Sequence, residues 1–137
     1  DLLSKNKVGA LIVIEQKSPL DEYTESGISI NAMLSSEHIC SLFWPGSPTH
    51  DGAIIIRNNE ILTAGCLLPL TNSRVSDKRL GTRHMSAIGI SEETDALVVI
   101  VSEETGTISV AEQGNLTRFL NREALETRLF NLFKEGD

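Results

Sequence analysis

The sequence of 137 residues contains little cysteine, few aromatic side chains and no long apolar run. Cys40 and Cys66 are too few for a disulfide framework and are not spaced as metal ligands, so we expect two small buried thiols in a reducing compartment. Aromatic residues make up 4% of the chain, which favours a core or rim position for Trp44 over a role in stacking bases. No apolar stretch reaches the roughly 18 residues needed to cross a bilayer.

Several sequence signals are also absent. No signal peptide opens the chain, and there is no internal repeat, low-complexity tract or proline-rich linker. The pattern G-x-x-x-x-G-K-[ST] does not occur, which argues against a P-loop nucleotidase, and the missing G-x-S-x-G elbow argues against a common hydrolase.

We expect a cytoplasmic protein. Because the chain begins at Asp1 and not at a methionine, we expect a membrane anchor of the full-length protein only upstream of Asp1.

The composition that is present suits one globular domain spanning residues 1–137. Hydrophobic residues make up 40% of the chain and charged residues 23%, so it can bury a core and is not disordered by composition. A chain of this length has room for one domain and not two.

Basic charge is scarce overall but concentrated in one segment. The chain has 12 Lys and Arg against 19 Asp and Glu, a formal charge of −7, which argues against a broad nucleic-acid-binding face. Residues 61–91 carry four basic side chains and one acidic side chain, whereas the segments on either side are net negative. An anion site is therefore expected in this middle segment, which contains Arg74, Lys78, Arg79 and Arg83.

Predicted strands and helices are interspersed along the chain. Apolar runs rich in β-branched residues predict strands at 9–15 and 96–102, and shorter patterns predict strands at 27–34 and 107–112. The run 53–68 predicts a hairpin that turns at Asn58–Asn59. Helices are predicted at 35–44, from Thr82 to about Glu93, and after an Asn121 cap, with Leu125, Leu129, Leu132 and Phe133 on one face. The sequence thus predicts an α/β fold, a mixed central β-sheet flanked by helices.

Three polar clusters stand where a predicted strand or helix begins or ends. The first, His50-Asp51-Gly52-Ala53, enters a strand, and its carboxylate and imidazole suit a divalent cation that holds polyphosphate. Its alternative interpretation is an aspartate that caps a turn. The second, Gly81-Thr82-Arg83-His84, opens a helix and could cradle phosphate with backbone N–H groups, a hydroxyl and a guanidinium. Its alternative is an N-capping Thr82 followed by solvated charges.

The third cluster, Ser102-Glu103-Glu104, follows the strongest predicted strand. A buried strand commonly ends in a polar turn, so two glutamates there are unremarkable by themselves. In α/β sheets, however, ligands sit at the carboxyl ends of strands. We therefore expect Ser102-Glu103-Glu104 to line one site together with the other two clusters.

Taken in order, these clusters resemble a known family. The segments PTHDGAIII, AGCLLPLT, LGTRHMSAIGISE and DALVVIVSEETGTISVA resemble the diadenylate cyclase (DAC, or DisA_N) domain, most closely its CdaA-like branch, over roughly residues 8–133. Members of that branch carry the domain behind a membrane anchor or another N-terminal segment. The pair DGA and GTRH, about thirty residues apart, is more specific than either piece.

The resemblance implies a metal-dependent nucleotidyltransferase. Such domains have a mixed sheet wrapped by helices and condense two ATP molecules into cyclic di-AMP, a bacterial second messenger, with release of two pyrophosphates. Each domain binds one ATP, and two must face each other as a homodimer for catalysis. The expected cofactor is Mg²⁺ or Mn²⁺, and no nucleic acid is expected as a partner.

The resemblance also assigns roles to residues of this chain. Asp51 matches the catalytic aspartate that assists the 3′-hydroxyl and its metal, and His50 matches a neighbour that reaches the metal. The remaining matched positions are nucleotide-binding: Gly52 and Ala53 in the DGA motif, Leu67 and Leu68 at the adenine, Thr82, Arg83, His84 and Ser86 at the phosphates, and Ser102 and Glu103 near phosphate and metal.

One position departs from the family pattern. The motif usually reads R-H-R, whereas this chain reads Arg83-His84-Met85. A thioether cannot bind phosphate as a guanidinium does. We expect an active cyclase because the other motif positions are intact. The alternative is a degenerate domain that binds or senses ATP or cyclic di-AMP without turnover, with Met85 inside the pocket.

Overall fold

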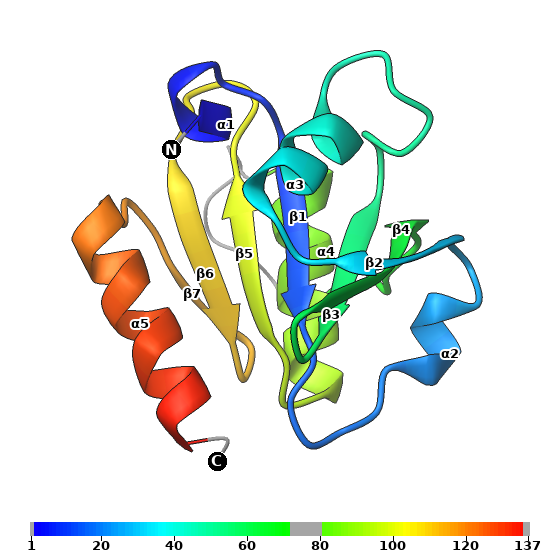
Figure 1. Ribbon diagram of the computed structural model, residues 1–137. Helices are drawn as coiled ribbons and strands as arrows, with labels where there is room; N and C mark the ends of the chain where they lie inside the picture. The colour runs from blue at the N-terminus through cyan, green and yellow to red at the C-terminus, as the bar shows by residue number, and fades with distance from the viewer. Residues whose placement is uncertain (1, 72–80, 136–137) are drawn as a thin grey trace.

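The computed structural model describes residues 2–71 and 81–135, the last three by their backbone alone (Figure 1). In these residues, seven strands form one sheet: β1 (Ala10–Ile14), β2 (Ile28–Met33), β3 (Ala53–Arg57), β4 (Glu60–Cys66), β5 (Leu97–Val101), β6 (Ile108–Glu112) and β7 (Asn115–Thr117). The helices are α1 (Leu2–Lys5), α2 (Asp21–Thr24), α3 (Ser36–Phe43), α4 (Thr82–Glu93) and α5 (Arg122–Glu135). This confirms the predicted mixed α/β architecture.

The strands follow the order β2-β4-β3-β1-β5-β6-β7. Within the described residues, β1 and β3 are the one parallel pair, and every other neighbouring pair is antiparallel. The central strands read as continuous apolar runs because both of their faces are covered.

Alternate residues of each central strand point to opposite layers, as the pleat of a strand requires. On β3, Ile54 and Ile56 join the core that packs against α1, α3 and α5, whereas Ala53 and Ile55 join the core beneath α4. Figure 1 shows the same arrangement, with α3 and α5 on one face of the sheet and α4 on the other. The sheet is therefore the middle of three layers.

Most predicted elements are confirmed within one or two residues. The hairpin turns at Asn58, whose φ of 56° is left-handed, and Arg57 pairs with Glu60. Asn121 caps α5, since its Oδ1 accepts from the Ala124 N–H at 2.8 Å. Three of the four residues predicted on its inner face, Leu125, Leu129 and Leu132, pack against the core. The fourth, Phe133, is described by its backbone alone. Of the basic residues predicted to form an anion site, Arg74, Lys78 and Arg79 lie outside the described residues.

Three short elements were not predicted, namely α1, α2 and β7. Strand β7 forms because Gln113 and Gly114 both take left-handed backbone angles, φ 52° and 81°, and turn the chain back onto β6. Both cysteines are free thiols; Cys66 is buried and Cys40 half-buried. Among the described residues, no helix is both long and apolar enough to cross a membrane.

Candidate active site

Four strand ends meet at one edge of the sheet. Ala10 at the start of β1 lies opposite Val101 at the end of β5, and Ala53 at the start of β3 lies opposite Cys66 at the end of β4. Helix α4 begins at the same edge. A cleft of about 510 Å³ opens there. The site is therefore formed by the amino ends of a parallel pair and the carboxyl ends of their antiparallel neighbours.

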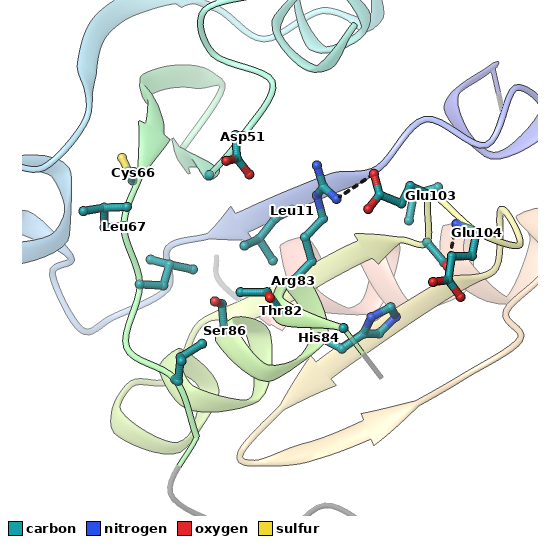
Figure 2. A pocket seen from close by; sticks show the side chains of 16 residues that line it. Leu11, Asp51, Cys66, Leu67, Thr82, Arg83, His84, Ser86, Glu103 and Glu104 are labelled. Carbon is teal, nitrogen blue, oxygen red and sulfur yellow. Dashed lines mark hydrogen bonds and ion pairs between the residues drawn. The ribbon is translucent and has the colours of Figure 1, made fainter. Parts of the chain in front are cut away.

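The cleft gathers residues from all three predicted clusters (Figure 2). They come from the loop before β3, from the start of α4 and from the turn after β5. The predicted site residues that line it are Asp51, Gly52, Leu67, Leu68, Thr82, Arg83, His84, Ser86, Ser102 and Glu103.

Two predicted site residues do not line the cleft. The ring nitrogen Nδ1 of His50 lies 2.6 Å from the Ser47 carbonyl oxygen, which ties the imidazole to its own loop. Ala53 is fully buried in the core beneath α4. The metal role of His50 and the nucleotide contact of Ala53 therefore remain predictions from the resemblance.

Arg83 lies at the centre of the cleft, and its guanidinium is only weakly bonded. Nη1 lies 3.4 Å from Glu103 Oε2, and Nη2 donates to the His50 carbonyl at 3.5 Å. Nε is buried and makes no hydrogen bond to any residue in the described part of the chain. In Figure 2 the side chain extends between Asp51 and Glu103. A guanidinium has five N–H donors, so this one keeps capacity for an anion such as phosphate.

The start of α4 adds backbone donors to the cleft. Gly81 is the N-cap and supplies no side-chain hydrogen bond, so the first N–H groups of the helix have no side-chain cap. Thr82 is the first helical residue and not the cap, contrary to the alternative considered from the sequence. A helix start of this kind favours bound anions.

The loop before β3 is shaped by a close approach of two backbones. Gly52 has a φ of +105°, and a Cβ there would lie 2.7 Å from the carbonyl carbon of Gly65. No other residue type fits without displacing β4. This contact places the exposed Asp51 at the mouth of the cleft, opposite the start of α4.

The turn after β5 is organised by Ser102. Its Oγ accepts from the N–H groups of Glu104 and Thr105, at 3.3 and 3.4 Å. These bonds are typical of a serine that stabilises a tight turn. They hold Glu103 where its carboxylate reaches Arg83.

An apolar wall closes the other side of the cleft. Leu67 and Leu68 follow β4, and Leu67 is 73% exposed. Sequence reasoning missed three apolar residues that also line the cleft, Leu11, Leu70 and Val101. Leu11 and Val101 could be placed at the cleft only from the pairing of the start of β1 with the end of β5. The sequence alone does not reveal this register. Burial raises the pKa of the Cys66 thiol, so it is a neutral part of the wall.

Met85 does not line the cleft, which corrects the expectation that it lies inside the pocket. It is residue four of α4, and helical geometry turns it away from Arg83. Its backbone carbonyl accepts from the Thr71 N–H at 3.2 Å. The Met85 side chain therefore contributes nothing to the lining of the cleft.

Two carboxylates, Asp51 and Glu103, line the cleft on either side of Arg83. Within the described part of the chain, no group of three or more His, Cys, Asp and Glu side chains could hold a metal alone. Mg²⁺ is typically held by one or two carboxylates, with substrate phosphates and water completing its shell. The donor set therefore fits a cation that arrives with a polyphosphate.

Comparison with known proteins agrees with this geometry. The chain is 50% identical over 134 residues to the cyclic di-AMP synthase CdaA of Bacillus subtilis, covering 98% of this chain and 49% of that protein. It is 46% identical over 123 residues to a diadenylate cyclase of Listeria monocytogenes, covering 90% of this chain and 45% of that protein. The chain thus spans about half the length of these relatives.

A solved structure shares the fold. The crystal structure of a double mutant of DacA from Staphylococcus aureus superposes with a TM-score of 0.94 at 45% identity, covering 96% of this chain and 88% of that one. The family described as DisA bacterial checkpoint controller nucleotide-binding matches residues 1–116. This chain therefore belongs to the DAC family of DisA-type nucleotide-binding domains.

Proposed function

We propose that this domain is a diadenylate cyclase, which condenses two ATP molecules into cyclic di-AMP and releases two pyrophosphates. The observation that carries the proposal is the placement of Arg83 between Asp51 and Glu103 at the start of α4, beside an apolar wall. This arrangement offers positive charge to a triphosphate and an apolar surface to a base. Relatives at 46–50% identity are named for this activity.

The proposed roles follow the chemistry of each wall. Leu67 and Leu68 contact the adenine, whereas Arg83 and the first N–H groups of α4 bind the phosphates. Asp51 accepts or orients the proton of the attacking 3′-hydroxyl. In each half-reaction a new O–P bond forms at the α-phosphorus, the bond to pyrophosphate breaks, and one proton is released.

A divalent cation, Mg²⁺ or Mn²⁺, would neutralise phosphate charge and lower the pKa of the attacking hydroxyl. Asp51 and Glu103 are the residues of this chain that would hold it. Because the proposed reaction needs two ATP molecules and the described residues form one such cleft, two chains must face each other as a homodimer. Fixing both reactants in this way supplies effective concentration.

The direct test is incubation of the protein with ATP and either MnCl₂ or MgCl₂, followed by chromatography and mass spectrometry. We expect cyclic di-AMP and pyrophosphate in a ratio of one to two, at a rate that rises more steeply than linearly with protein concentration. Tight ATP binding without product would instead support a sensing domain. That alternative rested on Met85, which lies outside the cleft.

A further inference from the structure

Gly9, immediately before β1, lies directly against the Arg83 guanidinium. A Cβ built on Gly9 would lie 2.6 Å from both Cζ and Nη1 of Arg83, and 3.0 Å from Nη2. Carbon atoms in contact sit about 3.5–4.0 Å apart. The guanidinium thus occupies the space that any side chain at this position would need.

The backbone does not explain a glycine here. Gly9 is not among the residues with left-handed φ, so its conformation is open to alanine. Gly27 and Gly89 differ, because a Cβ on either would meet backbone atoms, at 2.7 Å from Ala64 O and 2.2 Å from Pro69 O. At Gly9 the obstacle is the movable end of one side chain.

We propose that Gly9 is a positioning residue for the nucleotide site. Because Gly9 has no side chain, it leaves a space, called the seat below, which the Arg83 guanidinium fills and which fixes its position. The proposal rests on the proposed function of the cleft. Among the residues that the structure describes, Arg83 has no strong bond that could hold it in place, since its two polar contacts are 3.4 and 3.5 Å long and its Nε has no partner. The shape of the seat therefore determines where the guanidinium stands.

A methyl group at residue 9 would push the guanidinium by about 1 Å, the difference between 2.6 Å and an ordinary contact. A displacement of that size at a reacting site can cost up to about a hundredfold in rate. Gly9→Ala should therefore lower the rate by displacing the Arg83 guanidinium, and not by unfolding the domain.

The test is a double-mutant cycle of Gly9→Ala and Arg83→Ala. We expect each single variant to lower kcat/KM for cyclic di-AMP formation and to weaken ATP binding, by about tenfold or more. The double variant should match Arg83→Ala within about twofold, because there is no longer a guanidinium to displace. Additive losses, or a Gly9→Ala variant as active as the wild type, would overturn the proposal.

A second readout needs no nucleotide. The Arg83 side chain is 19% exposed in its seat, so its displacement in Gly9→Ala should speed its modification by phenylglyoxal severalfold, with Arg122, 72% exposed, as the internal reference. Unchanged labelling of Arg83 would contradict the seat. If Gly9→Ala fails to fold, the double variant should fold, and its failure to do so would also overturn the proposal.

These outcomes separate the seat from the cyclase activity. A wild-type protein that makes no cyclic di-AMP would refute the proposed function, while the labelling comparison would still test Gly9. A wild-type protein that is active, with Gly9→Ala indistinguishable from it in both readouts, would refute the seat alone.

Discussion

The Arg83 guanidinium is paired with Glu103 across the cleft, with Nη1 3.4 Å from Oε2. The pair is long, and the Glu103 side chain is 68% exposed, so the bond is weak. A bound phosphate would offer Arg83 a shorter, bidentate contact. Phosphate binding would then release the Glu103 carboxylate to the cation that accompanies the nucleotide.

This exchange predicts a specific phenotype for Glu103→Gln. The variant should need about tenfold more Mg²⁺ or Mn²⁺ for half-maximal cyclic di-AMP formation, because one of two candidate carboxylate ligands is lost. ATP binding measured without metal should be unchanged or tighter, since Arg83 loses a competing partner. Glu104→Gln is the matched control, with a smaller expected change. Equal metal dependence in Glu103→Gln and the wild type would count against the exchange.

Asp51→Asn should lose cyclic di-AMP formation by about a hundredfold or more, because an amide can neither accept the hydroxyl proton nor hold a cation as a carboxylate does. Its melting temperature should stay within a few degrees of the wild type, since the loop is held by the contact of Gly52 with Gly65. Product analysis and thermal unfolding measure the two effects. Retained activity would remove Asp51 from the mechanism.

Much of the fold could be predicted because its central strands are apolar on both faces and its turns carry clear signals. Asn58 at the β3–β4 turn and Asn121 at the start of α5 are examples. The short elements were missed for a physical reason. Helix α2 has no buried residue, and it is held by contacts distant in sequence, such as Tyr23 Oη donating to Glu93 at 2.6 Å.

The site was predictable where polar residues cluster in sequence and less so where the sheet register decides. The three clusters around Asp51, Arg83 and Glu103 do line one cleft. Leu11 belongs to it only because its strand starts beside the end of β5. Met85 was misplaced because neighbouring residues of a helix face different directions, about 100° apart.

Met85→Arg should change ATP affinity by less than about twofold, because the residue does not line the cleft. Titration calorimetry with ATP measures this, with Arg83→Ala as the variant expected to lose affinity. An improvement of tenfold or more would show that the arginine reaches the nucleotide after all. It would also revive the interpretation of Met85 as the mark of a degenerate site.

Ser26 should matter for the base and not for the phosphates. Its Oγ accepts from the Leu67 N–H at 2.9 Å and donates to the Tyr23 carbonyl at 2.8 Å, which ties the apolar wall to α2. Ser26→Ala should weaken ATP binding a few-fold, about the value of one hydrogen bond, and leave inorganic triphosphate binding unchanged. Equal losses for ATP and triphosphate would show a general disturbance and not a role at the base.

Glu15 should make the free energy of unfolding depend on pH in the acidic range. Its carboxylate accepts from Arg57 Nε at 2.6 Å and Nη2 at 2.8 Å and from the Leu20 N–H at 2.9 Å, and the bonds from Arg57 lower its pKa. A carboxylate with a lowered pKa stabilises the fold above its unfolded pKa of about 4.3, and this contribution is lost as the pH falls through the folded pKa.

Glu15→Gln should therefore lower the free energy of unfolding by about 1–2 kcal/mol at pH 7, a value discounted because the Arg57 side chain is 38% exposed. The gap between variant and wild type should narrow as the pH falls from 5 towards 3, as measured by denaturant unfolding across that range. Glu126→Gln is the matched control. Its ion pair with Arg122 is largely exposed, with side chains 62% and 72% accessible, so a change below about 0.5 kcal/mol is expected. A gap for Glu15→Gln that stays constant with pH would show that its charge contributes nothing to the stability.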